Sequence, residues 1–79
     1  MEFVAGDEKQ SMKDRGLTFE AVLAAPILGF IPNPGHCGQM ILVVNLDNYA
    51  TAAPCKPLEN GKWLLITAYP SRKYTKKYL

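Results

Sequence analysis

An apolar run followed directly by a turn signal constrains this chain more than any other feature of its sequence. QMILVVNL, residues 39–46, is rich in large and β-branched side chains, which favours a mostly buried strand. Asp47 and Asn48 come next, and both residue types tolerate the left-handed backbone of a tight turn. YATAAPC (49–55) is therefore expected to return beside the first strand. The centre of the chain is predicted to be an antiparallel hairpin.

Further strands are predicted on either side of this hairpin. PILGFIP (26–32) is a weak first strand, separated from the hairpin by the loop NPGHCG (33–38). Asn60-Gly61 is a strong hairpin signal, so WLLITAY (63–69) is expected as the last strand. Pro54 cannot donate to a strand ladder, and we expect it where its strand is bulged, ends, or forms an edge of the sheet.

Two short helices are predicted before the first strand. The polar segment Asp7–Asp14 forms the first, with Asp7 as its cap and Gly16 in the position of a C-terminal glycine. The second is FEAVLAA (19–25), which Thr18 caps and Pro26 ends. At helical spacing it presents one apolar face, made of Phe19, Val22 and Leu23.

The end of the chain is expected to form a third helix, opened by Pro70, with two different faces. Wound at about 100° per residue, the segment puts Tyr74 and Tyr78 on one face, where they can pack on the sheet. The other face carries four cations, Arg72, Lys73, Lys76 and Lys77. The predicted architecture is an α+β domain with two short N-terminal helices, a four-stranded mainly antiparallel sheet and a basic C-terminal helix.

Length and charge distribution point to one small domain with a partner. Seventy-nine residues leave room for a single domain, residues 1–79, and its core is marginal, so a stabilising partner is expected. The formal net charge is only +2, but the last ten residues carry four cations and no acid. Such a local field attracts polyanions.

The basic helix supplies candidate groups for RNA cleavage without a metal. That reaction needs proton acceptors and donors, together with cations that stabilise the crowded phosphate charge. Arg72 and Lys73 are candidate catalytic cations at the helix start, where free backbone N–H groups also favour an anion, and Lys9 is a third candidate. The candidate RNA-binding residues are Arg15, Lys76, Lys77, Ser71 and Asn33.

Each of these assignments has an ordinary alternative. A cationic face can serve solubility alone. Lys9 and Arg15 can form surface ion pairs with nearby acids, and they extend the cationic face only if the first and last helices adjoin. Asn33 can simply cap a turn. His36 is the only histidine, which excludes a two-histidine mechanism, and in its glycine-rich loop it is expected to be an exposed spectator.

Several classes of function lack the residues they need. The sequence has no zinc-ligand spacing, glycine-rich phosphate loop or paired carboxylates for glycoside chemistry, so we expect no metal and no cofactor. The N-terminus lacks a signal-peptide core, and the longest apolar stretch, residues 21–31, is too short to span a membrane. We expect a cytoplasmic protein without a membrane partner, in which Cys37 and Cys55 are free thiols, although the two could also pair.

The segment DEKQSMKDRGLTFEAVLA (7–24) resembles the start of the BrnT-type toxins of bacterial toxin–antitoxin pairs. Those begin with an aromatic residue and a polar helix, then a basic residue followed by Gly, Ile or Val, Ser or Thr, Phe and Glu. Phe3 and the segment 15–20 hold these places here. QMILVVNLDNY and WLLITAYPSRKYTKKYL resemble the later strands and basic end of a BrnT-like subgroup, so the resemblance covers nearly the whole chain.

The resemblance implies a compact RelE-like fold and a metal-independent endoribonuclease that acts on RNA and inhibits translation. It also implies a cognate DNA-binding antitoxin, through which the complex represses its own operator DNA. The chain departs from the pattern at Ile31, where the subgroup commonly has His before Pro-Asn, and at Ser11, where Asn is typical. Two alternatives stay open: a catalytically weak interaction module or co-repressor of the same fold, and a small nucleic-acid-binding protein without cleavage.

Overall fold

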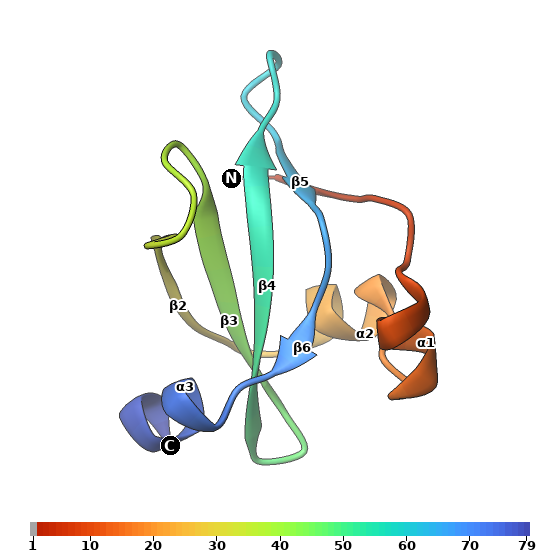
Figure 1. The fold of residues 1–79 in the computed structure, drawn as a ribbon, viewed down its shortest axis with the longest axis vertical. Coiled ribbons are helices and arrows are strands. Elements are labelled where there is room, and N and C mark those ends of the chain that lie inside the picture. Colours follow the sequence, from red (N-terminus) through yellow and green to blue (C-terminus); the bar gives the residue numbers. More distant parts are fainter. Residues whose placement is uncertain (1) are drawn as a thin grey trace.

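The computed structural model describes residues 2–79 as a single sheet with helices on both faces (Figure 1). α1 and α2 pack on one face, and α3 packs on the other. Within the described residues there are three helices and six strands, so the α+β class is confirmed but the predicted strand count is wrong. In chain order the elements are β1 (Phe3–Ala5), α1 (Gln10–Asp14), α2 (Phe19–Ala24), β2 (Ile27–Pro32), β3 (Met40–Leu46), β4 (Tyr49–Pro57), β5 (Trp63–Leu65), β6 (Tyr69–Pro70) and α3 (Arg72–Tyr78).

The strands follow the order β1-β5-β4-β3-β2, and β6 pairs with β4 beyond the end of β5. The pairs from β2 to β5 are antiparallel, as predicted. β1 is missing from the sequence-based prediction. It lies parallel to β5, with Phe3 opposite Trp63, which makes the sheet mixed. A strand of three residues whose partner lies at the other end of the chain has no local sequence signal.

Both predicted turns are present. Leu46 pairs with Tyr49 across the β3–β4 hairpin, and the two residues between them adopt left-handed backbone, with φ of 53° at Asp47 and 63° at Asn48. Gly61 has a φ of 79° in the loop between β4 and β5. In each case the residue that the turn requires was recognisable from its tolerance of positive φ.

Pro54 lies inside β4, at the centre of the sheet, so the prediction of a bulged, terminal or edge position is wrong. On one side it stands opposite Ile41 of β3. On the other side its carbonyl accepts a hydrogen bond from the Ile66 amide at 2.9 Å, but proline has no N–H to complete the pair. The ladder is interrupted there, and the predicted strand 63–69 is split into β5 and β6.

α1 is shorter than predicted because the residues before it have another role. Asp7 does not cap it; the helix starts at Gln10, and its N-cap Lys9 provides no side-chain hydrogen bond. Glu8 instead reaches the next helix, where its Oε2 accepts a hydrogen bond from the Phe19 amide at 3.0 Å. Gly16 ends α1 as predicted, with a φ of 71°.

α2 is capped as predicted, since Thr18 Oγ1 accepts a hydrogen bond from the Ala21 amide at 3.1 Å. Phe19 and Val22 are buried, but Leu23 is 42% exposed, so its predicted place in the apolar face is wrong. The helix is only six residues long. Phe19 and Val22, three residues apart, face the sheet, whereas Leu23 lies at the side of the helix.

Two apolar clusters stabilise the fold, one on each face of the sheet. The larger lies under α1 and α2 and contains Met12, Phe19, Val22, Leu42, Val44, Ala53, Cys55, Leu65 and Ala68. Three aromatic rings border it, with Phe30 in edge contact with both Phe3 and Trp63 at centroid distances of 5.7 and 5.2 Å. The smaller lies under α3 and contains Ile41, Val43, Ala50, Ala52 and Tyr74.

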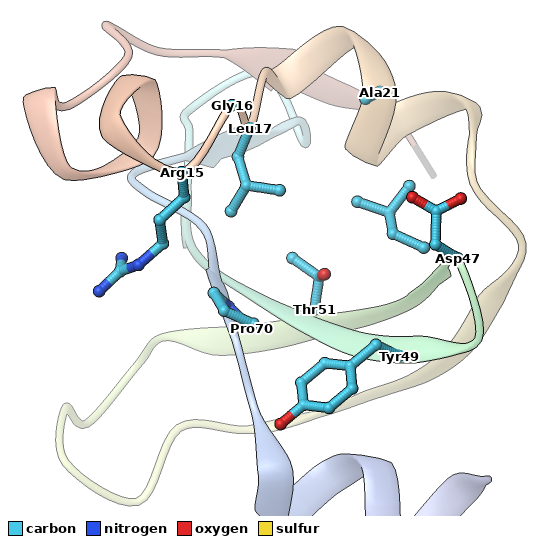
Figure 2. Close-up of a pocket in the computed structure, with 9 residues that line it drawn as sticks. Arg15, Gly16, Leu17, Ala21, Asp47, Tyr49, Thr51 and Pro70 are labelled. Atoms are coloured by element: carbon cyan, nitrogen blue, oxygen red, sulfur yellow. The ribbon is translucent and has the colours of Figure 1, made fainter.

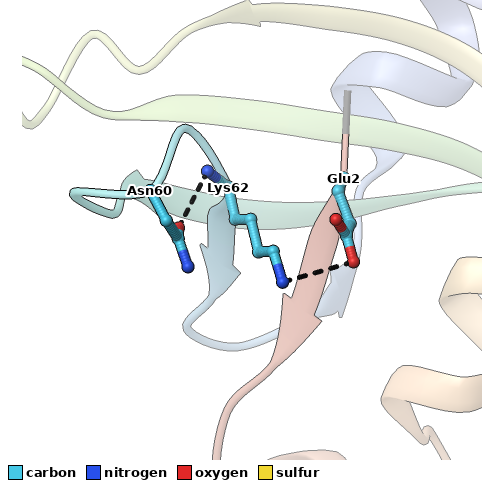
Figure 3. Close-up of polar contacts among 3 residues, drawn as sticks. All are labelled: Glu2, Asn60 and Lys62. Carbon is cyan, nitrogen blue, oxygen red and sulfur yellow. Dashed lines mark hydrogen bonds and ion pairs between the residues drawn. The ribbon is translucent and has the colours of Figure 1, made fainter.

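The start of the chain is tied to the loop after β4 (Figure 3). Lys62 Nζ lies 3.5 Å from Glu2 Oε1, and the Lys62 amide donates to Asn60 Oδ1 at 3.2 Å. The backbone adds to this, since the Trp63 amide donates to the Glu2 carbonyl at 2.9 Å. None of the helices in the described part of the chain combines the length and apolar character needed to cross a membrane.

Candidate nucleic-acid interface

α3 is held against the sheet by hydrogen bonds at its start. The Ser71 hydroxyl accepts from the Tyr74 amide at 3.2 Å and so caps the helix. Thr75 Oγ1 accepts from the Ala50 amide at 2.9 Å and donates to the Ser71 carbonyl at 2.7 Å. Pro70 belongs to β6, so its predicted place as the first helical residue is wrong.

The tyrosine face of α3 packs on the sheet as predicted. Tyr74 is 6% exposed in the cluster with Ile41 and Val43 of β3 and two alanines of β4, and Tyr78 is half-buried. Tyr78 lies over Gly29, since a Cβ atom at that glycine would come within 2.8 Å of its hydroxyl oxygen. The absence of a side chain at Gly29 therefore makes room for the ring.

The opposite face of α3 is a cationic strip, defined as Arg72, Lys73, Lys76 and Lys77, and all four residues are exposed. Lys73 and Lys77 lie along the helix beside tyrosine rings, with Nζ-to-centroid distances of 5.6 Å to Tyr74 and 5.4 Å to Tyr78. The one ion pair among residues 2–79 joins Lys62 to Glu2, so no carboxylate of the described chain neutralises the strip.

The remaining candidate site residues lie in different places. Ser71 is at the base of α3, but it is buried and its hydroxyl is used in capping. Arg15 is exposed at the end of α1 and lines a hollow together with Pro70, two residues before Arg72. It is thus close in space to the start of α3, although the two helices lie on opposite faces of the sheet.

Lys9 and Asn33 are not brought to the cationic strip. Lys9 lines a separate hollow with Lys56 and Leu64, at the end of β4 distant from α3. Asn33 lies in the β2–β3 loop, where its Oδ1 accepts from the Gly35 amide at 3.0 Å. Asn33 therefore caps a turn, which was the alternative to an RNA-binding role.

Groups able to exchange protons are sparse around α3. The titratable side chains of β6 and α3 are tyrosines and cations alone. His36 is exposed in the β2–β3 loop. Burial raises the pKa of the Cys55 thiol to about 11, against a smaller opposing effect of its backbone hydrogen bond at Leu42, so Cys55 is not a nucleophile near neutral pH. Both cysteines are free, and Cys37 is exposed.

The hollow beside Arg15 brings together residues that the sequence analysis did not treat as a site. Asp47 was recognised only as a turn residue, and Tyr49 and Thr51 only as parts of a strand. The three line one hollow with Arg15 and Pro70 (Figure 2). The available signal was weak: an aromatic residue directly after the Asp47-Asn48 turn.

Comparisons of the chain with protein-family models, with curated proteins and with solved structures find no match. Among residues 2–79, no group of three or more His, Cys, Asp or Glu side chains is arranged to hold a metal ion.

Proposed function

We propose that this protein binds single-stranded RNA through α3, with the cationic strip following the phosphate backbone. The observation that carries this proposal is the combination of four exposed, unneutralised cations on one helix with an anchored opposite face. A helix tied down by Tyr74 and Ser71 presents its charges in a fixed arrangement, which a flexible basic tail does not do.

The two pairs of cations have different places along the strip. Arg72 and Lys73 begin the helix next to β6, and Lys76 and Lys77 follow one turn later. A guanidinium can hold a phosphate through two parallel hydrogen bonds, whereas an ammonium acts as a point charge. Arg72 is therefore the residue suited to grip one phosphate, and the lysines are suited to follow the backbone.

RNA affinity measured at several salt concentrations tests this proposal. Lys76→Gln and Lys77→Gln should each lower the slope of log affinity against log salt by about 0.7, the value for one lost phosphate contact on a single strand. Lys13→Gln is the matched control, because Lys13 is an exposed helical lysine on α1, across the sheet from α3. Equal effects for all three lysines would contradict a specific role for α3.

The resemblance to BrnT-type toxins extends the proposal. On that basis the chain has a RelE-like fold, cleaves RNA, and is neutralised by a cognate DNA-binding antitoxin that carries the complex to operator DNA. Support comes from two short N-terminal helices, a hairpin-built sheet and a basic C-terminal helix in the expected order. In this reading Arg72 and Lys73 stabilise the charge that develops on the scissile phosphate.

Expression in a bacterial host tests the extension. The protein produced alone should arrest growth and fragment RNA, and production together with the protein encoded beside it should relieve both effects. A variant with Arg72→Ala that still folds should lose the arrest. If the unaltered protein is harmless at high level and total RNA stays intact, the toxin reading is refuted, while RNA binding by α3 is judged by the salt experiment alone.

One observation favours a second candidate, a binding module that does not cleave RNA. Ile31 occupies the place where the resembled subgroup commonly has His, and it packs against the apolar cluster under α3. Isoleucine cannot accept a proton, so the chain lacks the proton acceptor that the resembled subgroup commonly has at this position. RNA binding without cleavage by the unaltered chain, with cleavage gained by Ile31→His, would favour this candidate.

A further inference from the structure

The hollow beside Arg15 lies at the end of the sheet that also carries α3, on the face covered by α1 and α2. Its volume is about 400 Å³, which is in the usual range of small-molecule pockets. Its walls come from the α1–α2 turn, from Ala21 of α2, from the β3–β4 hairpin and from β6 (Figure 2). We call it the Arg15–Asp47 hollow after the two charged residues that line it.

The walls of the Arg15–Asp47 hollow suit a flat, apolar group. Leu17 points into it from the α1–α2 turn, and Pro70 lines it from β6. Tyr49 keeps 39% of its surface exposed although it begins a strand next to a buried segment. An aromatic ring left open beside apolar walls is a stacking surface for a nucleobase.

Thr51 adds a polar group to the hollow. Thr51 lines it and is only 2% exposed. None of the side-chain hydrogen bonds among residues 2–79 involves the Thr51 hydroxyl. The hydroxyl is not one of the buried side-chain atoms left without a partner, since in the described residues Asn45 Oδ1 alone is such an atom. It therefore reaches the surface of the hollow, where it can bond to water or to a bound molecule.

The two charged side chains stand apart from each other. Arg15 extends from one end of the hollow and Asp47 from the other, and they do not form an ion pair (Figure 2). Asp47 lies in the β3–β4 turn, where its φ is 53°. A ligand that fits has an anionic group at one end and hydrogen-bond donors at the other.

We propose that the Arg15–Asp47 hollow holds one guanine nucleotide of the bound RNA. The base stacks on Tyr49, and its N1–H and N2–H₂ donate to the Asp47 carboxylate. The Arg15 guanidinium holds the nucleotide's phosphate, and the Thr51 hydroxyl bonds to a polar atom of the base or sugar. Guanine is the base whose pairing edge offers two adjacent donors to a carboxylate, and unstacked bases of single-stranded RNA present that edge.

The link to RNA rests on the proposed function of α3. Pro70 lines the hollow, and the cationic strip begins at Arg72. The Ser71 amide between them donates to the Ala50 carbonyl at 2.8 Å, directly after Tyr49 in β4. The strip and the hollow lie on opposite faces of the sheet but at the same end of it, so a single strand of RNA that turns around β6 can reach both, and the guanine then fixes its register.

Nuclear magnetic resonance titration of the whole chain with GMP, IMP and AMP tests the inference. GMP should shift the amides around Arg15, Asp47 and Tyr49, and it should bind about tenfold or more tightly than AMP. IMP, which lacks the N2 amine, should lie between them. Tyr49→Ala should weaken all three nucleotides by about 5- to 140-fold.

Two conservative variants isolate the charged contacts. Asp47→Asn keeps a residue that tolerates positive φ and should remove the preference for GMP over AMP, whereas Asp14→Asn, at an exposed site outside the hollow, should leave it unchanged. Arg15→Gln should weaken GMP but not guanosine. Equal affinity for GMP and AMP, or GMP shifts confined to α3, would overturn the inference.

The outcomes separate this inference from the proposed function. If GMP does not bind while the salt experiment shows RNA on α3, the guanine subsite is wrong and the proposed function stands. If GMP binds in the hollow but RNA does not bind α3, the proposed function is wrong, and the hollow is not an RNA subsite. Binding of GMP together with a loss of RNA affinity in Asp47→Asn would support both.

Discussion

Replacing Tyr74 by alanine should detach α3 from the sheet. Tyr74 is 6% exposed and is the largest side chain of the cluster under α3. Burying about 150 Å² of an aromatic side chain is worth roughly 4 kcal/mol at about 25 cal/mol per Å². Residual burial in the unfolded chain lowers such a value by about 10–40%. We therefore expect Tyr74→Ala to lower the free energy of unfolding by about 3 kcal/mol.

The comparison with two other tyrosines gives this prediction its control. Tyr78 is only half-buried, so Tyr78→Ala should cost less, about 1–2 kcal/mol. Tyr69 is 36% exposed on β6 and does not belong to the cluster under α3, so Tyr69→Ala should lower stability without detaching α3. Tyr74→Ala is expected to be the most destabilising of the three variants.

Two measurements check the reasoning. Urea unfolding reports the loss of global stability for each variant. Hydrogen exchange reports α3 itself, because the Ala50 amide donates to Thr75 Oγ1 and should lose protection when the helix detaches. If Tyr74→Ala costs under about 0.5 kcal/mol, or the Ala50 amide keeps its protection, α3 is not anchored by Tyr74.

The other predictions concern cleavage, a close backbone contact and the thiols. If the protein cleaves RNA, Arg72→Ala should slow single-turnover cleavage by about 100-fold with a smaller loss of RNA binding. Arg72→Lys should recover only part of the cleavage rate. Equal losses for all four cations of the strip would mean that it is an electrostatic surface alone. Gly6→Ala should destabilise by about 1–3 kcal/mol in urea, because its Cβ would lie 2.5 Å from the Leu65 carbonyl oxygen, and unchanged stability would contradict the β1–β5 contact. Burial raises the pKa of Cys55 in the folded state from its ordinary 9.0 to about 11, so the contribution of the neutral thiol to stability is full below pH 9 and is lost as the pH rises toward 11. That loss should be absent in Cys55→Ala. A thiol reagent at pH 8 should modify Cys37 at once and Cys55 only after unfolding.

Local chemistry was enough to predict several elements of the fold. The hairpin at Asp47-Asn48 could be predicted because the φ values it needs belong to a short list of residue types. The two faces of α3 follow from the helical period, and the buried Tyr74 confirms them. The Thr18 cap and the Gly16 terminus are equally local.

Features that depend on distant partners could not be predicted. β1 exists because Phe3 meets Trp63, and Pro54 is tolerated in a central strand because its missing N–H faces the segment between β5 and β6. Glu8 lies within the range predicted for the first helix, but its side chain bonds to the Phe19 amide instead. In each case the outcome was decided by which segment lies alongside.

The candidate site also has a part that could be predicted from local sequence and a part that could not. The cationic strip is contained in one helix, and its exposure agrees with the prediction. Lys9 and Asn33 were grouped with it on their chemistry alone, and the structure puts them at other places in the fold. Arg15 shares a hollow with Pro70 only because the α1–α2 turn packs near β6, a contact that its neighbours in sequence do not reveal.

The binding surface of α3 depends on packing and not on the helix itself. A helix of seven residues is far below the roughly 12–15 residues at which isolated helices become marginally stable in water. Four neighbouring cations also repel one another and disfavour the helix when no anion is present. The docked helix therefore exists because Tyr74 and the Thr75–Ala50 hydrogen bond offset that repulsion. Any polyanion that binds the strip removes the repulsion, so binding and the docking of α3 must stabilise each other. RNA should for that reason raise the exchange protection of the Ala50 amide in the unaltered chain, and the same RNA should partly restore it in Tyr78→Ala.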